Sequence, residues 1–423
     1  MHQTHTVVIG AGVTGVTTCY ALLERGHRVT LVDRQRYAAM ETSFANGGQL
    51  SASNAEVWNR TATVLKGMRW MLRRDAPLLV NPRPSWHKGS WMLGFLAAVR
   101  SYEANTVETV RLAIRAREHL LRLAERESID FDRVERGILH IYETPGEYRH
   151  AERVNDLLAQ GGLERRAVSP AEIREIEPAI ARPLHGGFFT PSDATGDIHK
   201  FTRGLAEACL RRGATFLTGT HVSRLHADRE GVRLVLTGHE DEPDCPAPRE
   251  ERFDGAVVCA GVGSRDLARQ AGDRVNVYPV KGYSITVPLD DARSQEAAPW
   301  VSLLDDATKI VASRLGPTRF RVAGTAEFNG FNRDIRADRV RPLVRWVERY
   351  FPDVDTSACI PWAGLRPMMP DMMPHVGPGR SGRVFYNTGH GHLGWTLSPA
   401  TAEIVADMVS ERLPSKGEGT LAA

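Results

Sequence analysis

Three glycines near the N-terminus, Gly10, Gly12 and Gly15, have the spacing of a turn that binds the phosphates of a dinucleotide. A short apolar run precedes the turn. An apolar helical stretch, a second apolar run and then Asp33 follow it. Gly10 permits the tight turn, Gly12 lets the backbone approach a pyrophosphate, and Gly15 lets the helix pack closely on the strand. Asp33 is placed to accept hydrogen bonds from a ribose. The whole context predicts a dinucleotide-binding β-α-β unit, with a merely structural turn as the alternative.

Two later stretches also offer accessible backbone. Residues 41–54 read ETSFANGGQLSASN, a run of small and polar residues that is typical of an extended loop. Residues 253–264 read FDGAVVCAGVGS, an apolar strand that ends in Ala260 and Gly261. In open α/β folds, ligands bind beyond the carboxyl ends of the strands. Both stretches are therefore candidates for the ligand site.

Hydrophobic periodicity and helix start signals predict the elements that position these loops. Apolar residues repeat at helical spacing from residue 64 to about 133. Ser169 and Glu172 have the spacing of a capping box, and Asp197 is placed to cap the next helix. Alternation over residues 277–328 predicts an antiparallel meander. The further expectations are strands at 136–144, 215–217 and 232–237, a polar hairpin loop at 239–252, a helix from 398 to about 411, and an unstructured tail at 416–423.

The composition limits the classes of function. The chain has 423 residues, enough for two domains, and its 42% hydrophobic and 25% charged residues are ordinary for a globular enzyme. A net charge of +3 without a basic tract gives no sign of nucleic-acid binding. The five cysteines form no CxxC pair, which argues against a disulfide framework and against a metal site. Glycines interrupt the N-terminal apolar run, so we expect no signal peptide and a cytoplasmic protein, with any membrane contact peripheral.

Several segments resemble one family of enzymes. They are ETSFANGGQ at residues 41–49, YPVKGYS at 278–284, GLRPMMPD at 364–371 and NTGHGHLGWT at 387–396. Together with the N-terminal glycine turn, they are similar to the D-amino-acid dehydrogenase small subunit family, in the glycine and D-amino-acid oxidase group of flavin enzymes. The similarity extends over almost the whole chain and is specific for the family more than for the substrate.

The resemblance implies a two-part architecture. We expect an α/β fold with a Rossmann-type FAD-binding domain, discontinuous in sequence, and an α+β substrate domain whose antiparallel sheet covers the flavin. The FAD-binding domain would comprise residues 1–60, 196–274 and 359–415, and the substrate domain residues 61–195 and 275–358.

The resemblance also assigns cofactor-binding residues by position. The glycine turn and Asp33 would bind the ADP part, and the loop at 41–49 the pyrophosphate and the flavin edge. The segment 389–396 would pass the pyrimidine end of the flavin, where a helix N-terminus favours the negative charge of the reduced ring. The residues expected to bind FAD are Gly10, Ala11, Gly12, Thr14, Gly15, Asp33, Arg34, Thr42, Ser43, Asn46, Gly47, Gly48, Gln49, Val222, Ala260, Gly261, Gly364, Gly389, Gly391, Leu393, Gly394, Trp395 and Thr396.

Three further residues are candidates for the chemistry. Amino-acid oxidation by a flavin needs a fixed carboxylate, a neutral amine and a Cα hydrogen directed at flavin N5. We expect Arg366 to bind the carboxylate, because a guanidinium offers a planar bidentate fork and the arginine at this position has that role in related glycine oxidases. The alternative is an Arg366 that pairs with Asp371 or a backbone carbonyl. Tyr283 is either a second donor to the carboxylate or one more strand aromatic. His390 either lines the substrate cavity or bonds locally, and His392 receives no role.

One helical stretch could lie on a membrane. Residues 64–79 combine an apolar stripe with four cations, Lys66, Arg69, Arg73 and Arg74. Such a pattern suits an anionic surface at the inner face of the plasma membrane, where a quinone would accept electrons. Packing in the core or in a dimer is the alternative.

The sequence thus predicts an FAD-dependent D-amino-acid dehydrogenase. Its expected substrates are D-alanine, D-proline or hydroxyproline-like amino acids, oxidised by hydride transfer from Cα to flavin N5. The expected acceptor is a quinone or a similar electron-transfer partner. The alternatives are an oxidase that uses oxygen and a non-catalytic flavin-binding subunit of a larger complex.

Overall fold

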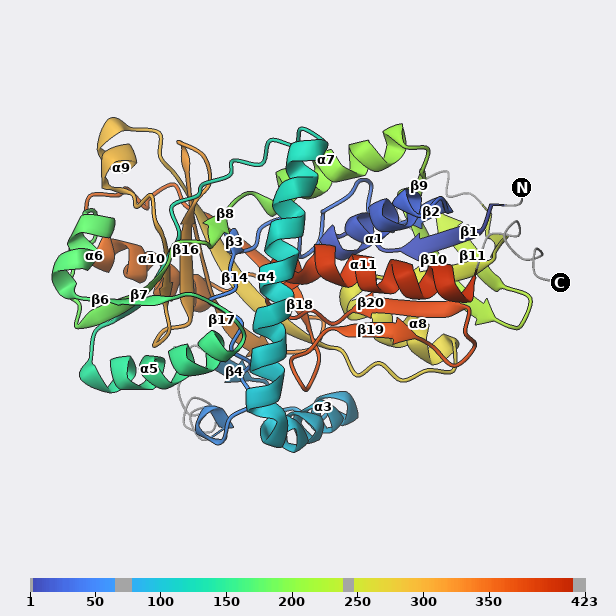
Figure 1. The fold of residues 1–423 in the computed structure, drawn as a ribbon, viewed down its shortest axis with the longest axis horizontal. Coiled ribbons are helices and arrows are strands. Elements are labelled where there is room, and N and C mark those ends of the chain that lie inside the picture. Colours follow the sequence, from blue (N-terminus) through green and yellow to red (C-terminus); the bar gives the residue numbers. More distant parts are fainter. Residues whose placement is uncertain (1–2, 65–77, 239–246, 414–423) are drawn as a thin grey trace.

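The computed structural model describes residues 3–64, 78–238 and 247–413, and it contains two large sheets (Figure 1). The first and last described segments lie together, since the Thr4 hydroxyl donates to the Leu413 carbonyl over 3.2 Å. The long helix α4 (Tyr102–Arg126) packs against α11 (Gly394–Arg412) on one side and α5 (Pro145–Gln160) on the other. The helix α4 therefore contacts elements from both parts of the molecule.

The first sheet has six strands in the order β19-β20-β13-β1-β2-β9. All its pairs are parallel except that of the edge strand β19 with β20. Residues that follow the carboxyl ends of β1, β2 and β13 therefore meet at one edge, as the sequence predicts. The strands are β1 (His5–Ile9), β2 (Arg28–Val32), β9 (Thr215–Leu217), β13 (Gly255–Val258), β19 (His375–Pro378) and β20 (Val384–Thr388).

Each face of this sheet is covered by a different layer. Val8 belongs to the apolar core formed with α1 (Val13–Glu24), α7 (Ile198–Arg211), α4 and α11. Val7 and Ile9 point to the opposite face, since side chains alternate along a strand. They pack on a three-stranded antiparallel sheet and on α8. The elements of that second layer are β10 (Thr220–Ala227), β11 (Val232–Gly238), β12 (Arg249–Phe253), η2 (Gly261–Gly263) and α8 (Ser264–Gln270).

The second large sheet has nine strands and is mostly antiparallel, in the order β18-β14-β17-β16-β15-β5-β7-β6, with β4 beside β17. Helix α10 (Ala337–Tyr350) packs on β14 and β17 around a core that includes Leu343 and Trp346. The strands are β4 (Leu78–Val80), β5 (Ile138–Tyr142), β6 (Arg166–Val168), β7 (Gly186–Thr190), β14 (Tyr278–Pro288), β15 (Ser302–Asp305), β16 (Ile310–Arg314), β17 (Arg319–Phe328) and β18 (Ile360–Met368). The remaining elements are β3 (Gln49–Leu50), β8 (Ala194–Thr195), α3 (Trp86–Ala97), η1 (Ala98–Ser101), α6 (Pro170–Ile176) and α9 (Ala292–Ala297).

The predicted helix start signals form in the structure. The Ser169 side chain accepts from the Glu172 amide, and the Glu172 carboxylate accepts from the Ser169 amide. The Asp197 carboxylate accepts from the amides of His199 and Lys200 at the start of α7. The predicted α/β fold class, with a parallel sheet and a separate antiparallel-rich part, is confirmed.

Three local predictions need correction. Helix α11 begins at Gly394 and not at residue 398, because its hydrogen bonds start with the Leu397 amide donating to the Leu393 carbonyl, and Pro399 lies inside the helix. Part of the polar stretch at 239–252 forms β12, which pairs with β11. The helical pattern predicted from residue 64 includes residues outside the described part and the short strand β4. Among the described residues, no helix is long and apolar enough to cross a membrane.

Candidate active site

A cavity of about 1340 Å³ is lined by residues from both large sheets. Typical small-molecule pockets measure roughly 300–1,000 Å³, so this one has room for a dinucleotide and a small substrate together. Its lining includes the ends of β1 and β2 at Ile9 and Val32 and the middle of β14 at Tyr283. The carboxyl ends of the parallel strands and the antiparallel sheet therefore contribute to one site.

The glycine turn after β1 leaves no room for a side chain at Gly10 or at Gly15. Gly10 has a φ of +112°, and a Cβ atom there would lie 2.5 Å from the Cys259 carbonyl oxygen. A Cβ atom on Gly15 would lie 1.7 Å from the Gly10 carbonyl oxygen. At the start of α1, the Val13 amide donates to the Ser43 hydroxyl over 3.0 Å. The backbone of this turn is held close to the cavity, as a phosphate site requires.

Asp33 is fixed by backbone amides. Its carboxylate accepts from the Ala11 amide over 2.6 Å and from the Gln35 amide over 2.7 Å. Burial raises the pKa of Asp33, while these two amide bonds oppose the shift. The carboxylate lines the cavity, so a ribose hydroxyl would meet an acceptor whose position is already set.

The loop at residues 41–49 is tied to the second sheet. The Thr42 hydroxyl donates to the Leu365 carbonyl over 2.9 Å, and the Gln49 side-chain amide donates to the Ser302 hydroxyl over 2.8 Å. Glu41 forms ion pairs with Arg34 and Arg333, and although burial raises its pKa, the two guanidinium groups hold it below its usual value. The loop therefore lies between the two sheets as part of the cavity wall.

The segment before α11 uses two glycines in the left-handed region, with φ of +77° at Gly389 and +60° at Gly391. The helix then begins at Gly394, and the Thr396 hydroxyl accepts from the Ser51 amide over 3.1 Å. The N-terminus of α11 thus faces the cavity with its partial positive charge.

The structure brings most of the expected cofactor-binding residues to this cavity. Four of them lie outside its lining: Ala11 holds Asp33, Gly15 packs α1 on β1, Gly48 forms a left-handed turn, and Thr396 holds the 41–54 loop. The expected residues that line the cavity are Gly10, Gly12, Thr14, Asp33, Arg34, Thr42, Ser43, Asn46, Gly47, Gln49, Val222, Ala260, Gly261, Gly364, Gly389, Gly391, Leu393, Gly394 and Trp395.

Arg366 lines the cavity without a carboxylate partner among the described residues. Its guanidinium lies over Gly282 and donates to the Thr325 carbonyl over 2.8 Å and to the Gly324 carbonyl over 3.5 Å. Burial lowers its pKa to about 10, so the group stays charged at neutral pH. Of the alternatives raised from the sequence, the pair with Asp371 is absent and the carbonyl bonds are present. Two carbonyls leave donors of the guanidinium available and its charge uncompensated.

Tyr283 and His390 also line the cavity, and both side chains have local partners. The Tyr283 hydroxyl donates to the Glu327 carboxylate over 2.8 Å. His390 Nε2 lies 2.9 Å from the Thr401 hydroxyl, and burial lowers the His390 pKa to about 3. His390 is therefore neutral at neutral pH. Their roles toward a substrate stay predictions.

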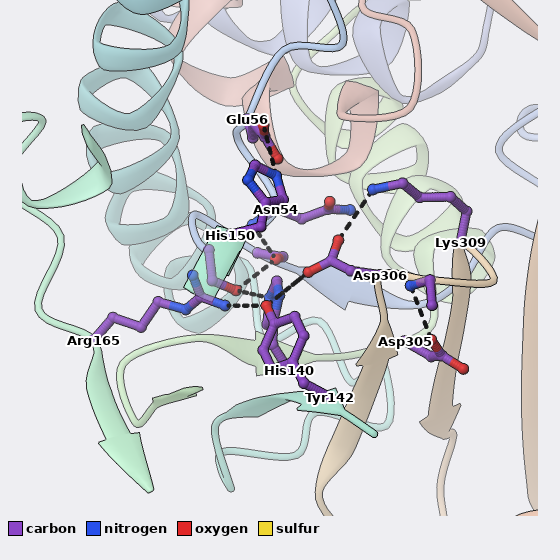
Figure 2. Close-up of polar contacts among 12 residues, drawn as sticks. Asn54, Glu56, His140, Tyr142, His150, Arg165, Asp305, Asp306 and Lys309 are labelled. Atoms are coloured by element: carbon purple, nitrogen blue, oxygen red, sulfur yellow. Dashed lines mark hydrogen bonds and ion pairs between the residues drawn. The ribbon is translucent and has the colours of Figure 1, made fainter. Parts of the chain in front are cut away.

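The sequence analysis missed a polar wall at one end of the cavity. We define the polar wall as His140, Tyr142, Arg165, Asp306 and Lys309, which lie together in Figure 2. The signal in the sequence is weak, because the five residues come from three separate stretches and form no motif. Only the alternation of β5, which places His140 and Tyr142 on one face, points to two of them.

Comparisons with known proteins agree with this geometry. The model of the DAO family, described as FAD dependent oxidoreductase, matches residues 5–408. D-amino acid dehydrogenase 3 of Mesorhizobium japonicum is 60% identical over 409 residues, which cover 96% of this chain and 97% of that protein. A D-amino acid dehydrogenase of Paramagnetospirillum magneticum is 42% identical over 417 residues, covering 96% of this chain and 95% of that one.

Solved structures share the fold. Glycine oxidase from Geobacillus kaustophilus superposes with a TM-score of 0.75 at 22% identity, covering 97% of this chain and 95% of that one. L-proline dehydrogenase from P. horikoshii superposes with a TM-score of 0.72 at 16% identity, covering 97% and 94%. The family match spans nearly the whole chain and includes every segment that builds the cavity, so the chain belongs to the DAO family of FAD dependent oxidoreductases.

Proposed function

We propose that this protein oxidises D-amino acids with FAD and passes the electrons to an acceptor other than oxygen. The observation that carries the proposal is Arg366, a cavity-lining guanidinium that lacks a carboxylate partner among the described residues and shares its cavity with the glycine turn. The names of the relatives, D-amino acid dehydrogenases at 60% and 42% identity, support the substrate class.

FAD fits the residues of this cavity. The turn at Gly10 and Gly12 and the start of α1 would hold the pyrophosphate, because Cβ atoms are missing there and the first-turn amides of a helix lack partners within the helix. Asp33 would accept from the ribose, and the N-terminus of α11 would lie at the pyrimidine end of the flavin. We retain the predicted boundaries of the FAD-binding and substrate domains as part of this proposal.

The chain's own residues would orient the substrate. Arg366 would bind the α-carboxylate with the donors that its two carbonyl partners leave available, and this fixes the Cα hydrogen relative to the cofactor. FAD, when bound, supplies a two-electron acceptor for the hydride from Cα. The amine nitrogen must lose its proton so that its lone pair forms the carbon–nitrogen double bond of the imine. Water then converts the imine of a primary amine to an oxo acid and ammonia, whereas a cyclic substrate such as D-proline gives a cyclic imine.

Anaerobic mixing tests the activity. The purified flavoprotein is mixed with D-alanine, D-proline and other D-amino acids without oxygen, and the flavin absorbance is followed. Bleaching by D-amino acids and not by their L-enantiomers supports the proposal. A spectrum that no candidate changes contradicts it and favours a non-catalytic flavin-binding subunit.

The acceptor is tested separately. A quinone or an electron-transfer partner is proposed because the relatives are named dehydrogenases. We expect D-alanine to reduce a quinone analogue or a dye much faster than it consumes oxygen. Oxygen uptake at the rate of substrate oxidation would identify an oxidase instead.

We also propose that the protein makes a peripheral contact with the inner face of the plasma membrane. The four cations Lys66, Arg69, Arg73 and Arg74 lie outside the described residues. On helix α3, which follows these residues in the sequence, Trp86, Leu93 and Leu96 are 82%, 66% and 50% exposed. Exposed apolar side chains that follow a basic stretch in the sequence suit an anionic bilayer surface.

Vesicle binding tests the membrane contact. We expect salt-sensitive sedimentation with anionic vesicles that weakens when the four cations are neutralised or when Leu93 becomes serine. Leu210→Ser is the control, because Leu210 is 48% exposed on a different helix, α7. An equal affinity of all variants would contradict the contact.

A further inference from the structure

We propose that the polar wall binds a second carboxylate, so that the preferred substrates are D-amino acids whose side chain carries a carboxylate, such as D-glutamate. The inference rests on the proposed function, and it names the substrate class of the same site. It is carried by Arg165, a residue 9% exposed, whose guanidinium has no carboxylate partner among the described residues and which lines the cavity.

Hydrogen bonds hold the polar wall in one arrangement (Figure 2). The Tyr142 hydroxyl donates to Asp306 over 2.7 Å. Because this bond takes the only hydroxyl proton of Tyr142, the Tyr142 oxygen acts as the acceptor for Arg165 Nη2 over 3.4 Å. Lys309 Nζ donates to the other oxygen of Asp306 over 3.1 Å. Asp306 thus fixes both the tyrosine that contacts Arg165 and the lysine.

The charges of this region do not balance. Lys309 is paired with Asp306, and the neighbouring Arg60 is paired with Glu56 over 2.8 Å. Among the described residues, Arg165 contacts the Tyr142 hydroxyl and the face of Phe188, whose ring centre lies 4.9 Å from the guanidinium carbon. A ring face and one hydroxyl compensate a buried cation weakly, compared with a carboxylate. An anionic group entering the cavity would supply the missing partner.

The polar wall lies within electrostatic reach of the α-carboxylate site. Burial, together with the charges of Arg366 and Lys309, lowers the pKa of His392 to about 3. The His392 imidazole is therefore close enough to interact electrostatically with Arg366, proposed for the α-carboxylate, and with Lys309 of the polar wall. The side chains of Lys309 and Asp306 are 44% and 29% exposed, and both line the cavity. Arg366 and Arg165 line the same cavity, and the proposal places the side chain of a substrate held by Arg366 against this wall.

The wall also selects against other side chains. An apolar side chain would leave Arg165 without a carboxylate partner and cover the Lys309–Asp306 pair. This costs free energy, because polar groups lose water without gaining hydrogen bonds. A cationic side chain would meet Arg165 and Lys309, like charges in a partly dehydrated site. A carboxylate gains charge-assisted hydrogen bonds from the same groups.

Substrate pairs that differ only in charge test the inference. In the holoenzyme, with a dye as acceptor, we expect kcat/KM for D-glutamate to exceed that for its isostere D-glutamine by ~10-fold or more, because bonds to charged groups are stronger than neutral ones. Arg165→Gln should lower kcat/KM for D-glutamate by ~30-fold or more and change that for D-alanine only slightly. Arg165→Lys keeps the charge and should restore part of the loss.

The neighbouring Arg166→Gln is the matched control. Arg166 is exposed and paired with Glu172 at the surface, so this variant removes the same charge next in sequence without touching the cavity. It should keep the selectivity for D-glutamate. Bound flavin per protein is measured for every variant, so that a folding defect is recognised.

A binding measurement adds a readout without turnover. Glutarate carries two carboxylates and butyrate carries one, and neither is oxidised at an amine. We expect glutarate to perturb the flavin absorbance of the holoenzyme at a lower concentration than butyrate, and Arg165→Gln to abolish that difference. A selectivity that survives in Arg165→Gln would overturn the inference.

The two proposals fail differently. Bleaching by D-alanine with equal kcat/KM for D-glutamate and D-glutamine overturns the second-carboxylate site and leaves the proposed function in place. The second-carboxylate site is also overturned if Arg165→Gln lowers activity on D-alanine as much as on D-glutamate, because Arg165 would then act on the fold. Bleaching by no D-amino acid overturns the proposed function itself.

Discussion

The two ends of the cavity present different chemical groups, backbone at one end and charged side chains at the other. At the nucleotide end, Gly10, Gly12 and Gly15 bring bare backbone and a helix N-terminus to the cavity, and the geometry comes from one continuous stretch of chain. At the substrate end, charged side chains such as Arg366 and Arg165 come from strands or loops far apart in the sequence.

The difference separates two kinds of recognition. A backbone cradle binds what dinucleotides share, so its requirement is the absence of side chains. The substrate end binds by charge, so its selectivity depends on which side chains are neutralised. Asp306 compensates Lys309, while Arg366 and Arg165 keep an uncompensated charge among the described residues. We therefore expect substitutions at the first end to remove the cofactor, and substitutions at the second to change the substrate.

The largest effect is expected at Gly15. In Gly15→Ala the new Cβ atom would lie 1.7 Å from the Gly10 carbonyl oxygen, so the turn must move away from α1. We expect loss of bound FAD or of soluble protein, measured as flavin per protein after purification. The control is Gly89→Ala on α3, where no atom lies within 4 Å of the new Cβ, and alanine should raise helix stability by up to ~1 kcal/mol. Normal flavin content in Gly15→Ala would contradict the proposal that the glycine turn holds FAD.

The next effect is expected at Arg366. Arg366→Lys keeps a positive charge but loses the planar fork, and we expect weaker substrate capture by about 2 to 5 kcal/mol, seen in kcat/KM for D-alanine. Flavin content should stay normal, because Arg366 contacts carbonyls of β17 and lies outside the glycine turn. Unchanged kinetics would remove the assignment of Arg366 to the α-carboxylate.

A moderate effect on stability is expected from His390, the buried histidine beside α11. Its pKa is about 3 in the folded protein, against 6.5 ordinarily, because burial disfavours the cation. The unfolded chain therefore binds a proton that the folded protein does not, between about pH 6.5 and 3. The free energy of unfolding should fall as the pH falls through this window, by ~1.4 kcal/mol per pH unit for this group.

Urea unfolding of the holoprotein at pH 6.5 and pH 5 measures this dependence. In His390→Asn the loss between the two pH values should be smaller by up to about 2 kcal/mol. His226→Asn, at a histidine whose side chain is 62% exposed, should keep the dependence of the unaltered protein. An identical dependence in His390→Asn would show that His390 takes up its proton in the folded state.

The smallest effect on catalysis is expected at Tyr283. Its hydroxyl donates to the buried Glu327, so Tyr283→Phe removes one donor from a carboxylate and should cost about 1 to 3 kcal/mol of stability, measured by thermal unfolding. We expect kcat/KM for D-alanine to change by less than ~3-fold, the equivalent of roughly 0.6 kcal/mol. A much larger kinetic loss would assign the hydroxyl to the substrate carboxylate, the other role that the sequence left open.

The predictable parts of the fold are those with local causes. The capping box at Ser169, the cap at Asp197 and the strands β9 and β11 follow from neighbouring residues and were predicted correctly. The start of α11 was misplaced, because Ser398 and Pro399 imitate a start signal while the hydrogen bonds of the helix begin at Leu393. Strand β12 was missed, since its polar residues become a strand only by pairing with β11.

By itself, the sequence determined the nucleotide end, because a glycine turn, its helix and Asp33 lie within one short stretch and obey local steric rules. The tertiary structure alone decided the polar wall and the partners of Arg366 and Tyr283. Which cation meets a carboxylate depends on strands paired across more than a hundred residues, as when Asp306 after β15 meets Tyr142 on β5. The charge left uncompensated at Arg165 is therefore a property of the packed molecule, and no local pattern of residues encodes it.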